Sequence, residues 1–259
     1  MPSTLPGVPD IDDQLATSIV ERLGAIEHGL RESVASSDDM MRWTARHLMD
    51  AGGKRVRPML VLLAASLGDV DAEGVQEAAI LVELTHLATL YHDDVMDEAV
   101  KRRGVDSANS RWTNTVAILS GDFLLAEASR LMSEIDTDTV RHFAETFSDL
   151  VTGQMRETVG ARGGDPVEHY LQVIREKTGV LIASAAYLGA THSGADEKIV
   201  RTVKEVGEAV GMVFQIVDDI IDIFSDSAQS GKTPGTDLRE GVFTLPVLYA
   251  LQDKGEAGE

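Results

Sequence analysis

Apolar residues recur at intervals of three and four along most of the chain, which is the spacing of one face of an α-helix. The first such stretch runs from Ile11 to about Val34 and repeats Leu15, Ile19, Leu23, Ile26 and Leu30. Further helices are expected at about 36–49, 59–67, 73–100, 107–133, 138–159, 166–190 and 196–225, with a last one near Leu245. Few segments alternate as a strand does, so the pattern predicts an all-α protein.

The segments between these helices are short and polar. Residues 1–10, MPSTLPGVPD, hold three prolines and are expected to form a flexible arm. A basic break, AGGKRVRP, covers 51–58, and a polar loop is expected at 227–237. Gly207 and Gly211 lie one helical turn apart and would let another helix approach closely. Neither a repeat nor a domain boundary is visible, so the chain is expected to be a single all-helical domain over 1–259.

Composition narrows the class of protein. The chain has 259 residues, of which 43% are apolar, and no cysteine, so it has ample material for a core and no disulfide frame. Its 23 basic and 43 acidic residues give a net charge of -20, which argues against a general nucleic-acid role. We see no secretory signal in the opening segment and no apolar run of about 18 residues, the length of a membrane span. These features favour a soluble, cytoplasmic protein.

Two acidic motifs carry the candidate chemistry. Asp93, Asp94 and Asp97 end one apolar run, in DDVMD, and Asp218, Asp219 and Asp222 repeat the same spacing in DDIID. Residues four apart share a helix face, so the carboxylates of each set crowd together and repel unless a cation binds. All-oxygen ligands favour magnesium, which keeps waters and accepts substrate phosphates as further ligands.

A lone acidic cluster is more often a solvated helix face than a metal site. The second copy changes that assessment, because both sets lie in apolar runs where unpaired carboxylates would be costly. The pair predicts two walls of one cavity, with metal ions and a polyanion between them.

The order of several motifs resembles one family, the trans-isoprenyl diphosphate synthases or polyprenyl synthetases. The matching elements cover about residues 50–250. They are GGKRVRP at 52–58, H-x6-DDVMD with RRG at 86–104, GDFLLA at 121–126, GQ at 153–154, KTG at 177–179, FQIVDDIID at 214–222, GKTPGTDL at 231–238 and TLP at 244–246.

The resemblance implies an isoprenoid-synthase-type bundle of antiparallel helices around a central cavity, usually in a homodimer. It implies that an allylic diphosphate condenses with isopentenyl diphosphate and that pyrophosphate is released. Mg²⁺ ions would bridge the aspartates and the allylic diphosphate. Charge and hydropathy have already argued against nucleic-acid binding and against a transmembrane segment, and peripheral membrane contact is expected for product release.

Residue roles follow from the same resemblance. Asp93, Asp97 and Asp218 would bind magnesium, with Asp94, Asp219 and Asp222 in support. The residues at or beside the allylic diphosphate would be Arg102, Lys177, Thr178, Gln215 and Lys232. Isopentenyl diphosphate would be held by Lys54, Arg57, His86 and Arg103, and Arg55 belongs to the same motif. Asp122 and Gln154 would support the site from behind or join helices.

Two departures from the family stand out. The family often has lysine in an EGKxTLP segment, whereas this chain reads EGVFTLP with Val242 in that place. One phosphate contact is therefore expected to be missing or supplied elsewhere. The chain also ends at Glu259, shorter than the family usually runs, so the resemblance implies that C-terminal helices are missing.

Product length in the family is set by the floor below the first aspartate motif. Thr89 and Ala88 stand four and five residues before Asp93, where short-chain members carry bulky aromatics. Thr85 continues the stripe downward on a helical wheel. These small residues predict a long-chain product. An aromatic plug from another helix would shorten it, and the candidates are Phe123, Phe143 and Phe147.

Other activities compete with this interpretation. A geranylgeranyl or farnesyl diphosphate synthase would differ only in cavity depth. A class I terpene cyclase would lack GGKRVRP and would usually carry an Asn/Ser/Glu-type second metal motif. A noncatalytic subunit of a heteromeric synthase would typically have lost its aspartate motifs, whereas this chain keeps both.

Overall fold

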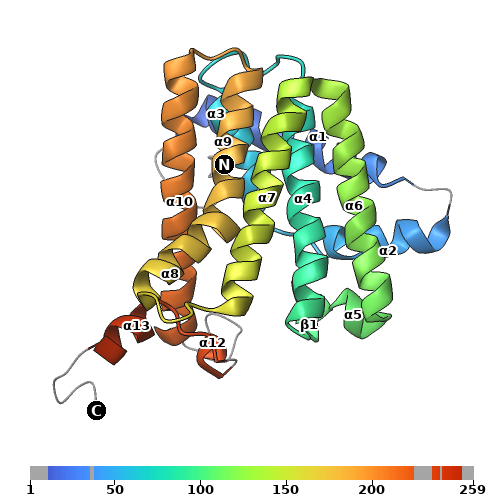
Figure 1. Ribbon diagram of the computed structural model, residues 1–259. Helices are drawn as coiled ribbons and strands as arrows, with labels where there is room; N and C mark the ends of the chain where they lie inside the picture. The colour runs from blue at the N-terminus through green and yellow to red at the C-terminus, as the bar shows by residue number, and fades with distance from the viewer. Residues whose placement is uncertain (1–10, 36–37, 225–234, 240, 253–259) are drawn as a thin grey trace. The chain divides into compact units, whose positions relative to one another are not determined.

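The computed structural model describes residues 11–35, 38–224, 235–239 and 241–252, and these are helical almost throughout (Figure 1). The all-α prediction is confirmed. The elements are α1 Asp13–Ser33, α2 Asp39–Asp50, α3 Val56–Ala65, α4 Val75–Met96, β1 Lys101–Arg102, β2 Val105–Asp106, α5 Ala108–Arg111, α6 Asn114–Ile135, α7 Thr137–Val159, α8 Pro166–Ile174, the π-helical turn η1 Arg175–Gly179, α9 Val180–His192, α10 Glu197–Phe224, α12 Thr236–Arg239 and α13 Leu245–Gln252.

Residue contacts group the chain into two compact units. Unit 1 comprises Met1–Phe143 with Ser184–Val203, and unit 2 comprises Ala144–Ala183 with Lys204–Glu259. The single-domain interpretation stays a prediction. Among the described helices, none is long and apolar enough to cross a membrane.

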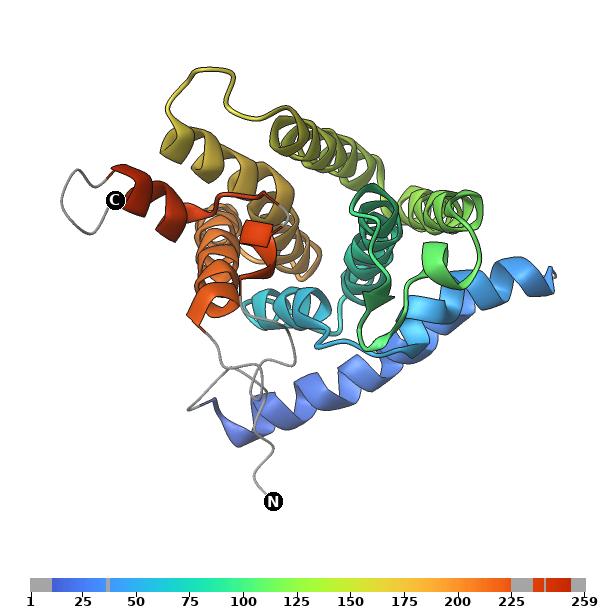
Figure 2. The same cartoon turned by 90° about the horizontal axis from the view of Figure 1, so that it is seen from below.

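Unit 1 is organised around α4. Viewed along its axis, α4 lies between α3 and α6, with the N-terminal helices along another side (Figure 2). Its side chains are buried nearly all round, including Leu81, Val82, Leu84, Leu87 and Ala88. A helix that is apolar on every face belongs inside a protein, which explains why this run shows no polar stripe.

The chain turns sharply after α4. Arg102 pairs with Val105 in a two-residue hairpin loop, whose central residues Arg103 and Gly104 both have positive φ, 53° and 79°. Such a turn matches the twist of the strands. The periodic spacing of apolar residues in the sequence does not predict this hairpin. The helix expected at 107–133 then begins as the short α5, breaks at Trp112, and restarts as α6 where the Thr113 side chain accepts from the Val116 amide at 3.2 Å.

Unit 2 contains the second departure from the expected helices. A single helix is expected at 166–190, but the structure divides it into α8, η1 and α9. A π-helical turn inserts one extra residue into a turn of an α-helix and needs no particular residue types, so the sequence pattern does not reveal it. Tyr170, Ile174 and Leu248 form a buried cluster that packs against Met212 and Ile216 of α10.

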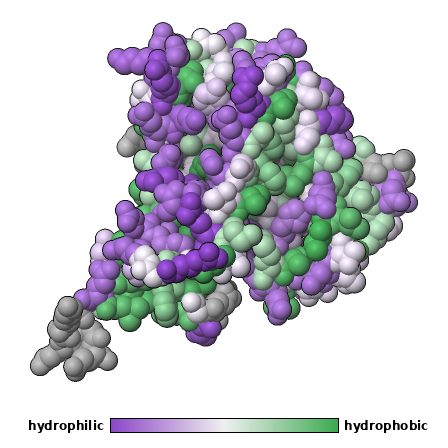
Figure 3. Space-filling model, viewed as in Figure 1, coloured by the Kyte–Doolittle hydropathy of each residue, from purple (hydrophilic) through white to green (hydrophobic). Residues whose placement is uncertain are grey.

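The surface of the described helices is mixed. On α6 of unit 1, Ile118 and Leu119 are exposed among polar neighbours, and Figure 3 shows green apolar and purple polar residues side by side over this helix. Unit 2 differs, because α10 exposes apolar side chains along its length, among them Val206, Val210, Val213, Val217 and Phe224.

Candidate functional site

The first acidic motif lies at the C-terminal end of α4. Asp93 is half-buried, Asp94 is fully buried at 0% exposure, and Asp97 is exposed as the C-cap residue. The Asp94 Oδ1 accepts from Arg102 Nε at 2.6 Å, whereas its Oδ2 has no hydrogen-bond partner among the described residues. Burial raises the pKa of Asp94, and the Arg102 guanidinium offsets part of that rise. Arg102 therefore holds the inner aspartate in place.

The residue before this motif anchors α4 to α6. His92 Nε2 lies 3.2 Å from Asp122 Oδ1, and a Cβ built on Gly121 would come within 2.4 Å of the same nitrogen. Only glycine leaves room for the imidazole at this crossing. Asp122 thus contacts the segment that carries the motif, which is where its expected supporting role would place it.

A cluster of cationic side chains surrounds His86, two turns before Asp93 on α4. Burial lowers the pKa of His86 well below its usual value, and the positive charges of Arg57 and Arg103 lower it further. Burial also lowers the pKa of Arg57 to about 10. The Arg57 Nε has no hydrogen-bond partner among the described residues. Arg57, His86 and Arg103, three predicted ligands of isopentenyl diphosphate, are therefore neighbours in unit 1. Lys54, three residues before Arg57 in the sequence, is exposed.

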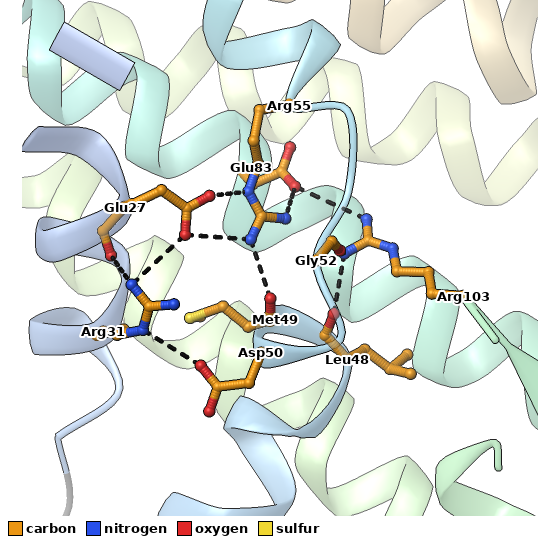
Figure 4. Close-up of polar contacts among 9 residues, drawn as sticks. All are labelled: Glu27, Arg31, Leu48, Met49, Asp50, Gly52, Arg55, Glu83 and Arg103. Carbon is orange, nitrogen blue, oxygen red and sulfur yellow. Dashed lines mark hydrogen bonds and ion pairs between the residues drawn. The ribbon is translucent and has the colours of Figure 1, made fainter. Parts of the chain in front are cut away.

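Arg55, from the same motif, is held by other protein groups. It is 8% exposed, and its guanidinium donates to Glu83 Oε1 at 2.8 Å, to the Met49 carbonyl at 3.0 Å and to both carboxylate oxygens of Glu27 (Figure 4). Its contact with substrate stays a prediction, but the four bonds leave only one N–H group, on Nη1, for such a contact.

Glu83 and Glu27 were missed by the sequence reasoning. Glu83 is 1% exposed and stands three residues before His86, so it shares that face of α4. One signal was available: an isolated carboxylate in a helix as apolar as α4 must have a cationic partner. The sequence does not say which of the nearby arginines it is.

The second acidic motif lies near the end of α10 in unit 2. Asp218 is exposed, whereas Asp219 is buried at 4% exposure. Asp219 accepts from the Tyr170 hydroxyl and from Gln215 Nε2, the latter at 2.9 Å. Burial raises the pKa of Asp219, and these two hydrogen bonds offset part of the rise. Thr178 Oγ1 donates to Gln215 Oε1 at 3.0 Å, so the motif is linked to η1.

Asp222 is the third member of this motif and is 8% exposed. Its Oδ2 accepts from the Asp237 amide at 3.2 Å, and its backbone carbonyl accepts from the Gly235 amide at 2.7 Å. The aspartate therefore ties α10 to the segment that leads into α12. Lys232 lies outside the described residues. Val242 is exposed, and its amide donates to the Asp237 carbonyl at 2.9 Å.

Close backbone packing supports the same part of unit 2. A Cβ on Gly211 would come within 2.7 Å of the Gly179 Cα, so α10 and η1 touch through glycine, as the sequence predicts for Gly211. Lys177, in η1, forms an ion pair with Glu157 of α7. One chain of hydrogen bonds in this unit joins three predicted site residues, Thr178, Gln215 and Asp219.

The donor set fits a hard cation, although no preformed cage is present. Among the described residues, no group of three acidic, histidine or cysteine side chains is arranged to hold a metal ion. Magnesium is usually bound by one or two carboxylates with substrate phosphates and waters as the other ligands. Carboxylates such as Asp93 and Asp97, one turn apart and at least partly exposed, are compatible with that mode.

The predicted product-length residues occupy different environments. Thr85 and Ala88 are fully buried, and the Thr85 hydroxyl donates to the Leu81 carbonyl at 2.8 Å. Neither lines accessible space in this structure, whereas Thr89 is partly exposed. Tyr91 points toward α2, where its hydroxyl contacts the Thr44 carbonyl.

Known proteins resemble this chain over nearly its whole length. A family model described as polyprenyl synthetase matches residues 38–259. A nonaprenyl diphosphate synthase of Mycobacterium tuberculosis is 49% identical over 257 residues, which are 98% of this chain and 77% of that protein. A heptaprenyl diphosphate synthase component 2 of Geobacillus stearothermophilus is 42% identical, over 90% of this chain and 73% of that protein.

Solved structures agree with the sequence relatives. A geranylgeranyl pyrophosphate synthase from Corynebacterium glutamicum, complexed with calcium and isoprenyl diphosphate, has a TM-score of 0.84 and 58% identity, covering 96% of this chain and 75% of that one. A heptaprenyl diphosphate synthase from Staphylococcus aureus has a TM-score of 0.86 and 34% identity, covering 91% and 76%. With its cationic cluster and both acidic motifs, the chain belongs to the polyprenyl synthetase family.

Proposed function

We propose that this chain is a magnesium-dependent prenyltransferase. It condenses an allylic diphosphate with isopentenyl diphosphate, releases pyrophosphate and yields a long-chain trans-polyprenyl diphosphate. The observation that carries the proposal is the cluster in unit 1, where Arg57 and Arg103 crowd a neutral His86 two turns before an acidic motif. The buried Glu83 carboxylate offsets part of this positive charge, and the excess that remains favours binding of a further anion.

Isopentenyl diphosphate supplies the anion. Arginine binds phosphate oxygens through paired N–H groups, and the unpaired Nε of Arg57 is one such donor. The neutral imidazole of His86 donates one further hydrogen bond without adding charge, and exposed Lys54 adds a mobile ammonium group. These residues hold the second substrate while its double bond attacks.

The acidic motifs serve the allylic diphosphate. Asp93 and Asp97 in unit 1 and Asp218 in unit 2 are the carboxylates with access to solvent, so they are assigned to magnesium. Asp94, Asp219 and Asp222 are buried and hydrogen-bonded within the protein, so they hold their neighbours in position. Bound divalent cations neutralise the charge that grows on the leaving diphosphate. Lys177, Thr178, Gln215, Arg102 and Lys232 complete the allylic side.

Product length is the finer part of the proposal. The relatives named as nonaprenyl and heptaprenyl synthases support a long-chain product, as does the small, partly exposed Thr89. A geranylgeranyl diphosphate synthase is the second candidate. It is supported by the Corynebacterium glutamicum protein and by the burial of Thr85 and Ala88, which leaves less open floor.

Assembly and location are also proposed here. We infer a homodimer in the cytoplasm that touches membranes only to release product. Two relatives are named as component 2 of a heptaprenyl diphosphate synthase, so a heteromeric assembly is the alternative for this chain. Size measurement of the purified protein distinguishes a self-assembled dimer from a monomer that needs another subunit.

A product assay tests the activity. The protein is incubated with magnesium, labelled isopentenyl diphosphate and either farnesyl or geranylgeranyl diphosphate, and product length is read by chromatography. Products of six or more isoprene units support the long-chain proposal, and products that stop at four units support the second candidate. Absence of condensation by folded protein with either primer overturns the enzyme proposal and favours a noncatalytic subunit. A chelator control tests the need for metal.

A further inference from the structure

A buried ion-pair network lies beneath the cationic cluster of unit 1. The Arg55 guanidinium connects three helices, because it contacts Glu27 of α1, the Met49 carbonyl near the end of α2 and Glu83 of α4 (Figure 4). Arg55 itself has a left-handed backbone with φ of 49° at the start of α3. Such a conformation is unfavourable for a residue with a Cβ and persists where surrounding contacts enforce it.

A second arginine reaches the same carboxylate from the hairpin. Arg103 Nη2 lies 3.8 Å from Glu83 Oε1, and Arg103 Nη1 donates to the Leu48 carbonyl at 2.9 Å and to the Gly52 carbonyl (Figure 4). A Cβ on Gly53 would come within 3.0 Å of the Arg103 Cζ. The guanidinium therefore packs directly on the two glycines that precede Lys54.

Glu83 is the common carboxylate of these cations. Burial lowers the pKa of Arg57 and of Arg103, and the negative charge of Glu83 offsets part of that fall. For Arg55 the contacts with Glu27 and Glu83 together outweigh burial, so its pKa is raised. Glu27 forms ion pairs with Arg55 and Arg31, whereas Glu83 forms ion pairs with both Arg55 and Arg103. Removal of Glu83 would leave three guanidinium groups with like charges facing each other.

We propose that Glu83 is a positioning residue for the isopentenyl diphosphate pocket. It fixes Arg55 and Arg103, and through them the Gly52–Gly53 backbone, so that Lys54 and Arg57 are presented to a diphosphate. The inference rests on the proposed function and deepens it. It assigns Arg55 to the support of the pocket, since four of the five N–H groups of Arg55 already bond to other protein groups. It also gives a buried acid, Glu83, a role in binding an anion.

Simple electrostatics and a positioning role predict opposite effects of losing Glu83 on diphosphate binding. Loss of a carboxylate near a diphosphate site removes a repulsion and would tighten anion binding. A positioning role predicts weaker binding, because Arg55 and Arg103 lose the carboxylate that they share, repel each other and shift the glycine segment that Arg103 contacts. The direction of the change in binding by a folded variant therefore decides between the two accounts.

The test is direct binding of isopentenyl diphosphate by calorimetry, without metal or allylic substrate. For Glu83→Gln we expect the dissociation constant to rise about tenfold, the scale of one lost charge-assisted contact. Glu77→Gln is the matched control, because it makes the same exchange on α4 close to His192 and away from the arginines. It should leave binding unchanged. Glu27→Gln, which affects Arg55 alone of the three arginines, should weaken binding by about twofold to threefold.

A double variant checks the route. If Glu83 acts partly through Arg55, the double variant Arg55→Gln/Glu83→Gln will bind more tightly than the sum of the two single changes predicts. If Glu83→Gln does not fold, Glu83→Asp keeps the charge but withdraws it by one methylene, and weaker binding is again expected.

The possible failures are distinguishable. Unmodified protein that does not bind isopentenyl diphosphate overturns the proposed pocket and this inference with it. Unmodified protein that binds, together with a folded Glu83→Gln variant that binds equally well or more tightly, overturns the positioning role alone.

Discussion

The two aspartate motifs have the same spacing but different surroundings. In unit 1 the inner aspartate, Asp94, is paired with a charged group, Arg102, at 2.6 Å. In unit 2 the inner aspartate, Asp219, receives hydrogen bonds from two neutral groups, Tyr170 and Gln215. Burial raises the pKa of both carboxyl groups. An identical sequence pattern is therefore stabilised by a salt bridge in one unit and by neutral donors in the other.

The fifth position of each motif differs as well. Asp97 is exposed at the end of α4, whereas Asp222 is buried and accepts a backbone hydrogen bond. The comparison teaches that spacing specifies which carboxylates share a helix face but not which of them are available to a ligand. Availability depends on the partners that the rest of each unit provides.

The largest expected effect is on the condensation rate, which Asp97→Asn should lower far more than Asp222→Asn. If Asp97 binds magnesium directly, its neutralisation should lower the condensation rate about 1,000-fold. Asp222→Asn keeps an oxygen that can accept from the Asp237 amide, so a loss of about tenfold is expected. Steady-state assays at several magnesium concentrations measure both. Asp138→Asn, an exposed residue of α7 paired with Arg141, is the control. Equal losses at the two motif positions would show that the difference in burial has no functional meaning.

The next largest effect concerns the glycines beside each motif. Gly211→Ala would press a Cβ against the Gly179 backbone, which cannot move aside, so about 2–3 kcal/mol of unfolding free energy should be lost. Gly121→Ala meets the end of the His92 side chain, which can rotate, so about 1 kcal/mol is expected.

Urea unfolding measures both changes. Gly24→Ala in α1, where a Cβ has open space, is the control and should stabilise the protein by about 0.5–1 kcal/mol. A smaller loss for Gly211→Ala than for Gly121→Ala would mean that α10 and η1 separate easily.

Sequence alone predicted most of the helices, because long 3.6-residue periodicity determines them directly. It placed α1, α7 and α10 within a few residues of their observed ends. It did not predict η1 or the hairpin, since both depend on the local backbone rather than on an apolar pattern. It also identified Arg57, His86 and Arg103 as neighbours from family motifs. Glu83 was missed, because its role depends on arginines that come from two other segments of the chain.

A smaller effect tests the charged and neutral partners directly. Arg102→Gln leaves the buried Asp94 carboxylate without its cation, and about 2 kcal/mol of unfolding free energy should be lost, moderated by the partial exposure of Arg102. Tyr170→Phe removes one neutral donor while Gln215 remains, so about 1 kcal/mol is expected. Both are measured without metal or substrate. A larger loss for Tyr170→Phe would reverse the comparison and make the neutral network the stronger support.

The smallest expected effect is the pH dependence of stability that the surroundings of His86 in unit 1 produce. His86 has a pKa well below its usual value, because of burial and the positive charges of Arg57 and Arg103. The unfolded chain therefore binds a proton that the folded protein does not, and stability falls as the pH drops below about 6.5. His86→Gln removes this contribution, so the stability difference between pH 7.5 and 5.5 should shrink by about 1 kcal/mol.

His28→Gln is the matched control, because that exposed side chain pairs with Glu32 rather than facing arginines. It shows what the exchange of a histidine for a glutamine does to stability away from the cationic cluster. Addition of pyrophosphate sharpens the test. An anion bound among the arginines would offset their charge and raise the pKa of His86, so the ligand should flatten the pH dependence of the unmodified protein but not that of His86→Gln. If pyrophosphate flattens both equally, the anion binds away from His86 and the cationic cluster is not its site.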